Sequence, residues 1–448
     1  MVTSAVLKLG GSLSVCNERL APSRFALSVL MSVVLMLALA GNARAGARET
    51  VPYRFAGGTD GLYPFGSLVM DSEGNLYGTT EEGGTPNPHC RSLCGTVFEL
   101  SPNGATWTKT TLYTFMGSDD GNFPAAGLVL DNQGNLYGTT YFGGEQYAGT
   151  VFELKRTSSG WRKETLHRFN GTDGAWPDAG LVIDTQGNLL GTTLTGGTAG
   201  GYGGTVFKLS PGPTGWTSTV LHNFGGNGDG AFPLSAVILD SGGNVYGTAA
   251  LGGTTIGCVF SFGCGIVFEL SPNPDGTYTE NVLHYFDGNP YAGGTDGAYP
   301  ETTPIFDSQG NLYGATESGG THGCDNGGCG EVYKMTPNGD GTWTYESLYQ
   351  FGATPSDGSI PAYSIVFDKS GNLYGSTLQG GGFSECEEYC GTIYELSPAG
   401  SSWTETVIFS FDYSDGEYPN GVIIDSLGRL YGTAEGGAGG GVVFQIIP

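Results

Sequence analysis

A chain of 448 residues with a formal net charge of −26 is strongly acidic and is repelled by phosphate backbones, which argues against a nucleic acid partner. Its 81 glycines and 12% aromatic residues are typical of many short strands joined by tight turns. No segment keeps the 3.6-residue apolar period of a helix, so we predict an all-β fold.

The first 45 residues stand apart from the rest of the chain. Arg24 precedes an apolar run from Phe25 to Ala40, and Ala43-Arg44-Ala45 offers a small-x-small cleavage site. These features predict a secretory signal peptide over residues 1–45. An uncleaved membrane anchor is the alternative, although the run is short for a span of ~20 residues. We expect one domain over residues 46–448, monomeric and secreted, periplasmic or at the cell surface, with no stable membrane insertion after cleavage.

One motif recurs seven times in that domain, at intervals of 53 to 67 residues, which indicates a repeat architecture. A clear copy is Asp131-Asn-Gln-Gly-Asn-Leu-Tyr-Gly-Thr-Thr140. It predicts an apolar strand ending at Asp, a tight turn, and a second short strand. The Asp side chain can accept hydrogen bonds from the amides just ahead of it. The seven residues are Asp71, Asp131, Asp184, Asp240, Asp307, Asp368 and Asp425.

Each repeat contains four predicted strands. In the second repeat they cover residues 127–131, 136–140, 149–154 and 161–169. Four strands joined by short hairpins form one antiparallel sheet, and a ring of such sheets is a β-propeller. The fourth strand always opens on an aromatic residue and reaches Phe eight residues later, but only six copies follow a motif.

The missing fourth strand lies at the other end of the chain. Glu49-Thr50-Val51, leading to Phe55, matches Glu405-Thr406-Val407, leading to Phe411. Pro52 suits an edge strand, because proline cannot donate to a ladder. We therefore predict a seven-bladed β-propeller of four-stranded antiparallel blades, in which residues 48–55 complete the last blade and close the ring.

Eight cysteines form four close pairs, each just before a third strand. An even count in an exported chain favours disulfides, and zinc is the alternative. Bridges over so few residues constrain the unfolded chain only a little, so we expect them to shape exposed loops. The pairs are Cys90/Cys94, Cys258/Cys264, Cys324/Cys329 and Cys386/Cys390.

The recurring Gly-Asn-Leu-Tyr-Gly-Thr-Thr, Gly-Gly and Gly-Thr-Val-Phe-Glu-Leu segments resemble the GloVer tandem repeats of bacterial exported proteins, also called choice-of-anchor repeat proteins. The resemblance covers about residues 53–448 and all seven copies. It implies an exported, propeller-like protein and no particular activity. More loosely, Asp-x-x-Gly-Asn-Leu-Tyr is similar to NHL-type and streptogramin lyase-like propellers.

In the predicted ring, the loops from strand four to the next strand one and from strand two to strand three emerge on one face, which we call the loop face. The first set carries Asp-Gly-x-aromatic-Pro, with Trp176 in the third copy. Its carboxylates suit Ca²⁺ or Mg²⁺ and its aromatic rings suit a glycan. The alternative, which sevenfold repetition favours, is a turn whose aromatic and proline pack between blades. The candidates are Asp60, Asp120, Asp173, Asp229, Asp296, Asp357 and Asp415.

Other candidates break the repeat. Four glutamates follow strand two: Glu81, Glu82, Glu317 and Glu435. Paired carboxylates suit acid/base chemistry on a glycoside, and the alternative is that these side chains are simply exposed to solvent. His89 and His322 lie in the cysteine loops. We consider two interpretations for each: a general base or metal ligand, and a solvated side chain. Three further histidines share a position filled elsewhere by Tyr or Phe, which predicts aromatic substitutes on the outer strand: His167, His222 and His284.

The sequence predicts no catalytic residue. The preferred hypothesis is a secreted non-enzymatic propeller that binds an extracellular glycan or protein through its loop face. The alternatives are a polysaccharide-active or streptogramin lyase-like enzyme and a structural envelope component, and the fold alone cannot choose among them. No cofactor is expected apart from a Ca²⁺ or Mg²⁺ ion on the loop face.

Overall fold

The computed structural model describes the chain from Ala47 to Pro448. Within it, residues 91–93, 199–202, 226–227, 254–257, 259–261, 289–294, 325–326, 355, 383–389 and 438 are not described. The predicted signal peptide, residues 1–45, lies outside the described residues. In the part that is described there are no α-helices, and hence none that could cross a membrane.

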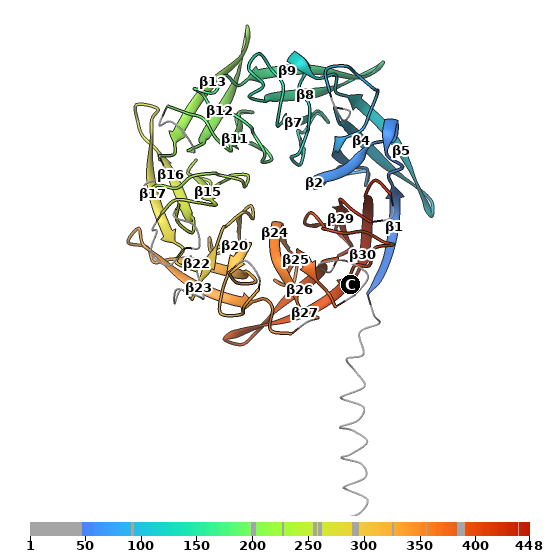
Figure 1. Ribbon diagram of the computed structural model, residues 1–448. Coiled ribbons are helices and arrows are strands. Elements are labelled where there is room, and N and C mark those ends of the chain that lie inside the picture. Colours follow the sequence, from blue (N-terminus) through green and yellow to red (C-terminus); the bar gives the residue numbers. More distant parts are fainter. Residues whose placement is uncertain are drawn as a thin grey trace, which may run out of the picture. The chain divides into compact units, whose positions relative to one another are not determined.

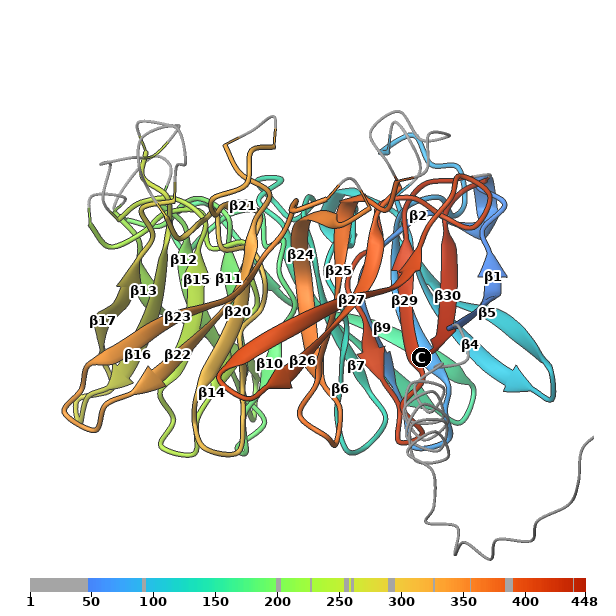
Figure 2. The ribbon, with the colours of Figure 1, turned by 90° about the horizontal axis from the view of Figure 1, so that it is seen from below.

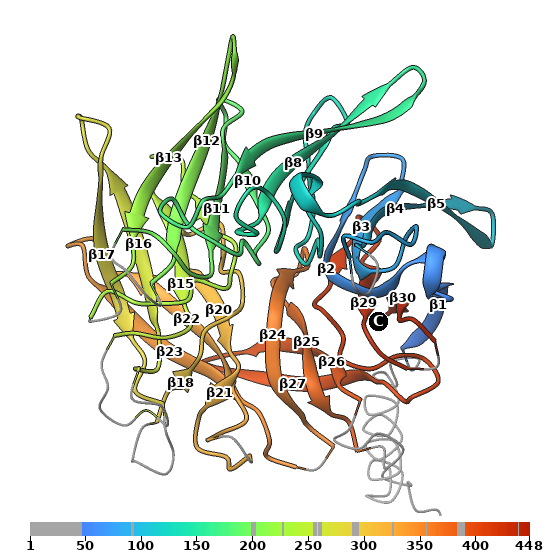
Figure 3. The same ribbon diagram turned by 45° about the horizontal axis from the view of Figure 1, so that its top comes forward.

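The described residues form seven four-stranded antiparallel sheets arranged in a ring, which confirms the predicted seven-bladed β-propeller (Figure 1). In the first six blades the strands follow chain order from the axis outwards, and in the seventh the N-terminal strand is outermost. A short extra pair lies on the loop face beside the fifth blade (Figure 3). Blades 1 to 3 contain β2 (Leu62–Met70), β3 (Leu76–Glu82), β4 (Thr96–Asn103) and β5 (Thr106–Thr114); β6 (Val129–Leu130), β7 (Leu136–Thr140), β8 (Thr150–Thr157) and β9 (Gly160–Arg168); and β10 (Val182–Ile183), β11 (Leu189–Thr193), β12 (Thr205–Gly212) and β13 (Gly215–Asn223).

The remaining four blades continue round the ring. They contain β14 (Ile238–Leu239), β15 (Val245–Ala249), β16 (Ile266–Pro272) and β17 (Tyr278–Tyr285); β19 (Ile305–Phe306), β20 (Leu312–Thr316), β22 (Glu331–Pro337) and β23 (Trp343–Gln350); β24 (Gly358–Phe367), β25 (Leu373–Gly380), β26 (Thr392–Ala399) and β27 (Ser402–Ser410); and β28 (Ile423–Ile424), β29 (Leu430–Ala434), β30 (Val442–Ile447) and β1 (Arg48–Arg54). The extra pair is β18 (Gly297–Ala298) with β21 (Ser318–Gly319), and two 3₁₀ turns are η2 (Gly58–Asp60) and η3 (Ser118–Asp120).

The N-terminal strand closes the ring as predicted. β1 pairs antiparallel with β30, from Arg48 opposite Ile447 to Arg54 opposite Val442. The register shifts between Thr50 and Tyr53, so Pro52 falls at an irregularity, where its missing donor is tolerated. The last blade is therefore built from both ends of the described chain.

Aromatic pairs join the blades at equivalent places. The Phe near the end of each fourth strand packs edge-to-face on the aromatic residue of the next blade's third strand, as Phe55 does on Phe98 with ring centroids 5.1 Å apart. Such pairs contribute about 0.5–1.5 kcal/mol beyond the area they bury. The other six are Phe115–Phe152, Phe169–Phe207, Phe224–Phe268, Phe286–Tyr333, Phe351–Tyr394 and Phe411–Phe444.

The first strands are shorter than predicted in five blades. The predicted strand over residues 127–131 pairs only at Val129 and Leu130. Just before it, the Ala126 carbonyl instead accepts a hydrogen bond from the Thr79 hydroxyl of the neighbouring blade. Threonine hydroxyls bridge to Ala179 and Ser235 in the same way. Near the axis, hydrogen bonds between blades thus take the place of pairing within a blade.

The predicted loop face is present at one end of the ring, and the Asp turns lie at the other (Figure 2). In the second blade the Asp131 carboxylate accepts the amides of Gln133 and Asn135 at 2.8 Å each. It also accepts the Asn135 side-chain amide and the Tyr137 hydroxyl, at 2.9 and 3.1 Å. All seven motif carboxylates accept the equivalent two amides, which confirms the predicted turn chemistry.

Candidate functional site

The Asp residues of the Asp-Gly-x-aromatic-Pro motif are engaged in their own turns. Asp60 accepts the Ala56 amide at 2.8 Å and the Tyr53 hydroxyl at 2.7 Å. Burial would raise its pKa, but these hydrogen bonds and the Lys109 ammonium lower it. An equivalent backbone amide donates to each of the other six, Asp120, Asp173, Asp229, Asp296, Asp357 and Asp415. The structure places them at seven separate blade boundaries.

The aromatic residue of this motif is held by a bond between blades. The Trp176 amide donates to the Ala148 carbonyl at 2.8 Å, and Pro177 packs against Gly149, where a Cβ would lie 2.5 Å from the proline ring. Trp176 has a φ of 58°, a left-handed conformation that costs roughly 1–2 kcal/mol. The equivalent residue in every blade has a φ of 54 to 62°, including Ile360. The inter-blade bond therefore imposes the conformation, whatever the side chain.

An aromatic cluster lies beside the centre of the loop face. Trp176 stacks on Tyr141, with centroids 5.9 Å apart and planes 12° apart, and Phe142 contacts both rings edge-on. The Trp176 side chain remains 38% exposed. Burial, and then the nearby Asp178 carboxylate, raise the pKa of Tyr141. An exposed aromatic surface thus borders a carboxylate.

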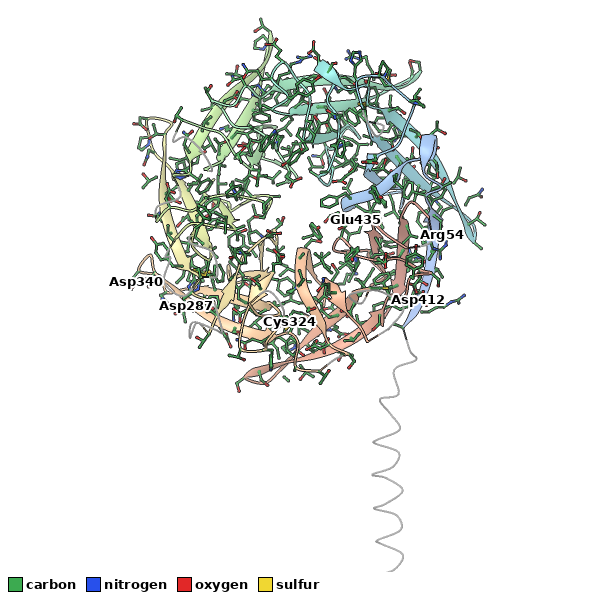
Figure 4. All side chains as sticks on the ribbon, in the orientation of Figure 1. Arg54, Asp287, Cys324, Asp340, Asp412 and Glu435 are labelled. Carbon is green, nitrogen blue, oxygen red and sulfur yellow. A yellow bond between two sulfur atoms is a disulfide. The ribbon has the colours of Figure 1, made fainter. Side chains whose placement is uncertain are left out.

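Five carboxylates converge on the loop-face mouth of the central channel, and we call them the mouth carboxylates. Glu81 lies near the end of the second strand β3, Glu317 and Glu435 follow second strands, and Asp178 and Glu301 follow the prolines of the Asp-Gly-x-aromatic-Pro motif. All five side chains are partly exposed. Figure 4 shows Glu435 at the inner edge of the ring. Asp178 and Glu301 line a channel cavity of about 160 Å³.

The mouth carboxylates affect one another's ionisation. Burial, followed by the charges of Glu435 and Asp178, raises the pKa of Glu81 to about 7. Burial also raises the pKa of Asp178 to about 6 and that of Glu435 to about 7, although an Asn420 hydrogen bond lowers the latter.

Glu301 and Glu317 form a hydrogen-bonded pair. Burial raises the pKa of Glu301 well above its usual range, and the neighbouring Glu317 and Asp178 raise it further. Burial likewise raises the pKa of Glu317. A carboxyl pair in direct contact cannot ionise fully without strong repulsion. The hydroxyl of Tyr363 lies near enough to four of the five carboxylates for their charges to raise its pKa after burial does.

No basic side chain compensates this charge within the described part of the chain. Every described lysine and arginine lies on a third or fourth strand, or in the Asp turns at the opposite end of the ring. Nor do the mouth carboxylates form a ready metal centre, because no three of them bring oxygens within 4.8 Å of one another among the described residues. Among the described residues, the mouth is therefore an acidic site without a basic partner.

The sequence pointed to part of this site. The structure brings Glu81 and Glu317 together with Glu435, while the pKa of Glu82 is raised by burial alone. Asp178 and Glu301 were missed. The residue after the motif proline could have pointed to them, because this position is acidic in only two repeats, at Asp178 and Glu301. Four other repeats hold an apolar residue there: Phe65, Ala125, Leu234 and Ala362.

The histidine candidates lie away from the mouth. His89 is exposed, His322 is half-buried, and neither lines the channel cavity. His167 and His284 bond to Asp173 and Asp296 at 2.9 and 2.8 Å, in the position that tyrosines fill elsewhere.

Three of the four predicted disulfides are present in the described part of the chain. They join Cys90 to Cys94, Cys258 to Cys264, and Cys324 to Cys329. The fourth, between Cys386 and Cys390, is not among them. Cys390 is described, fully buried in the core between the last two blades, and disulfide-bonded. Cys386 lies outside the described residues, so its role as the partner of Cys390 stays a prediction. Three disulfides fit a protein that works outside the cytoplasm.

The fold and the site define a seven-bladed propeller with an acidic loop-face mouth. The chain belongs to the Gloeobacter/Verrucomicrobia repeat family, whose model matches residues 42–260 and 257–448. This agrees with the resemblance seen in the repeats.

Comparisons with solved structures add the fold alone. PorZ, a surface component of the type-IX secretion system of Porphyromonas gingivalis, is 17% identical with a TM-score of 0.51, over 88% of this chain and 48% of PorZ. A proposed 6-phosphogluconolactonase of Bacteroides uniformis is 16% identical with a TM-score of 0.48, over 75% of this chain and 84% of the other. Among curated proteins, none matches this chain.

Proposed function

We propose that this chain is an exported, non-enzymatic propeller that binds a basic segment of an extracellular protein at the loop-face mouth of its channel. The observation that carries the proposal is the convergence of five carboxylates with no described lysine or arginine among them. A lysine or arginine side chain entering the mouth would relieve their repulsion and return their pKa values towards the usual range.

The aromatic cluster supports the same ligand. The exposed Trp176 face and its partner Tyr141 border Asp178, and a cation held against an aromatic face gains about 0.5–2 kcal/mol. The cluster also favours a second candidate, a glycan that stacks on Trp176. A neutral glycan, however, leaves the mouth carboxylates without a partner.

Glycoside hydrolysis fits the geometry less well. Retaining and inverting glycosidases hold their two carboxyl groups about 5 to 9.5 Å apart, so that the scissile bond lies between them. The Glu301 and Glu317 carboxyls are instead joined by a direct hydrogen bond, which leaves no room for that bond.

A direct test is fluorescence anisotropy with a labelled octalysine peptide at pH 7.5. We expect binding that weakens steeply with salt. Exchanging Glu301, Glu317 and Glu435 together for glutamine should weaken it at least tenfold. The matched control removes as many charges from the outer strands and hairpins, where Asp340 lies at the rim of the ring (Figure 4), through Glu164→Gln, Asp340→Asn and Glu346→Gln.

Each outcome decides between the candidates. Equal binding by the two triple variants would show that bulk charge, and not the mouth, attracts the peptide, and would overturn the proposal. Failure of octalysine to bind, together with binding of a neutral oligosaccharide that Trp176→Ala abolishes, would establish the glycan candidate instead.

A further inference from the structure

Each blade boundary brings together three side chains near the rim of the loop face. One comes from a fourth strand, one is the Asp of the Asp-Gly turn, and one stands on the fourth strand of the next blade, two residues after its opening aromatic. The last position holds different residues at the seven boundaries: Lys109, Lys163, Ser218, Glu280, Tyr345, Glu405 and Glu49.

At two boundaries this place holds a cation. The Lys109 ammonium donates to the Asp60 carbonyl, to Asp60 Oδ1 and to Thr111 Oγ1 at 2.5, 3.1 and 2.9 Å. Lys163 makes the same three contacts with Asp120 and Thr165, at 2.6, 2.9 and 2.7 Å. Both lysine side chains are almost fully buried. The fold thus has a cation pocket at these boundaries, built from oxygen donors.

At the boundary between blades 3 and 4 the lysine is replaced by Glu280, and its threonine neighbour by Val282. His222 Nε2 lies 3.6 Å from Asp229 Oδ2 and 3.9 Å from Glu280 Oε1. Both distances are too long for hydrogen bonds. At the two other histidine boundaries, by contrast, the His–Asp distance is 2.9 and 2.8 Å. This boundary therefore has no lysine, and its histidine lies farther from the Asp than at the other two histidine boundaries.

Two of the three facing atoms are buried and without hydrogen bonds, whereas Asp229 Oδ2 accepts the Gly225 amide at 3.1 Å. His222 Nε2 and Glu280 Oε1 are both inaccessible to water and have no hydrogen-bond partner. Buried polar atoms of this kind are costly unless something binds them. Two ligands on a tetrahedral ion with bonds of ~2.0–2.2 Å lie roughly 3.3–3.6 Å apart, close to the observed distances.

We propose that His222, Asp229 and Glu280 bind a divalent transition-metal ion such as Zn²⁺, which links blades 3 and 4. The three ligand atoms lie within 4.8 Å of one another and form the one such group found in the described part of the chain. One imidazole and two carboxylates suit zinc better than calcium, which takes oxygen ligands. The ion would take the place that the lysine ammonium holds at the equivalent boundaries.

The boundaries between blades 5 and 6 and between blades 6 and 7 show what the histidine adds. Glu405 faces Asp357, and Glu49 faces Asp415, so these boundaries also pair two acids. Their fourth-strand residues are Tyr349 and Phe409, which supply no imidazole. Among the seven sets of three boundary side chains, only the set between blades 3 and 4 combines a histidine with two carboxylates. We therefore expect binding of one ion per chain.

The test uses the chain from residue 47, purified with chelator and dialysed against ZnCl₂. We expect one tightly retained zinc per chain by elemental analysis, and a higher melting temperature with zinc than without. Co²⁺ should give the visible absorption of a four-coordinate ion. Glu280→Gln and His222→Gln should each weaken zinc binding at least tenfold.

The matched control is His167→Gln, which removes the histidine of a boundary where Ser218 stands in place of the glutamate. It should retain zinc like the unaltered chain. The exchange Glu280→Lys with Val282→Thr rebuilds the lysine boundary, and should raise the zinc-free melting temperature while abolishing zinc binding. Zinc retention unchanged by Glu280→Gln and His222→Gln, or no zinc retained by the unaltered chain, would overturn the proposal.

Discussion

Carboxylates lie at both ends of the ring, but the surroundings of Asp71 at one end and of Glu81 and Glu435 at the other shift the pKa in opposite directions. At the Asp-turn end, burial would raise the pKa of Asp71, yet hydrogen bonds from Asn75, Tyr77 and Glu73 lower it. At the loop-face mouth, burial raises the pKa of Glu81 and Glu435 to about 7, with few donors to oppose it. The first arrangement repeats in every blade and stabilises the fold. The second breaks the repeat, as a binding site does.

The repeated part should be most sensitive where the ring closes. Phe55 is buried against Phe98, as Phe411 is against Phe444. Phe55→Ala should lower the free energy of unfolding by about 3–5 kcal/mol, because it removes a large buried ring. Phe411→Ala is the matched control, and urea unfolding of both should give losses within ~1 kcal/mol of each other. A loss below ~1 kcal/mol for Phe55→Ala alone would mean that β1 does not close the ring.

The Asp turns should follow. Asp131→Ala removes the acceptor of four hydrogen bonds, and we expect a loss of about 2–3 kcal/mol in unfolding free energy, measured by urea denaturation. Asp131→Asn keeps one acceptor oxygen and should lose about half as much. Glu317→Gln at the mouth is the comparison, because it removes a charge that burial disfavours. If Glu317→Gln destabilised the chain as strongly as Asp131→Ala, the contrast between the two ends would be wrong.

The mouth should give the smaller effect, with a characteristic pH dependence. The folded chain binds protons at Glu81 and Glu435 up to about pH 7, whereas unfolded carboxyls release them near pH 4.5. Their contribution to stability is therefore fully present below pH 4.5 and is lost as the pH rises to about 7. Between pH 5 and pH 8 we expect the melting temperature to fall.

The Glu301, Glu317 and Glu435 glutamine variant tests this contribution, because it removes the titration of Glu435 and of the neighbouring pair while it keeps Glu81. Its free energy of unfolding should change by ~1–2 kcal/mol less over the same pH range, because a pKa unit corresponds to ~1.4 kcal/mol and channel water reduces the full effect. The outer-strand charge variant should keep the slope of the unaltered chain. Identical slopes for the two variants would contradict the raised pKa values.

The sequence predicts what is local and repeated. Asp131 and Asn135 stand four residues apart, so their turn can be inferred from the motif, and the match between Glu49 and Glu405 predicts the ring closure. The mouth is neither local nor repeated. Asp178 and Glu435 come from blades 3 and 7 and meet only because the ring closes, so their positions in separate repeats gave no sign of a shared site. The seven Asp residues of the Asp-Gly-x-aromatic-Pro motif, such as Asp60, form a visible pattern in the sequence because they repeat. Their contacts in the structure are those of turns.

We expect the mouth carboxylates to be partly protonated when free and to ionise around a basic ligand. Calorimetric titration of octalysine at pH 6.5, in buffers of different ionisation enthalpy, counts the protons exchanged on binding. We predict release of about one or more protons per peptide bound, because a cation lowers the pKa of Glu81, Glu301 and Glu435. The outer-strand charge variant should release as many, and the mouth variant markedly fewer. Binding with no proton release, or with proton uptake, would contradict the account.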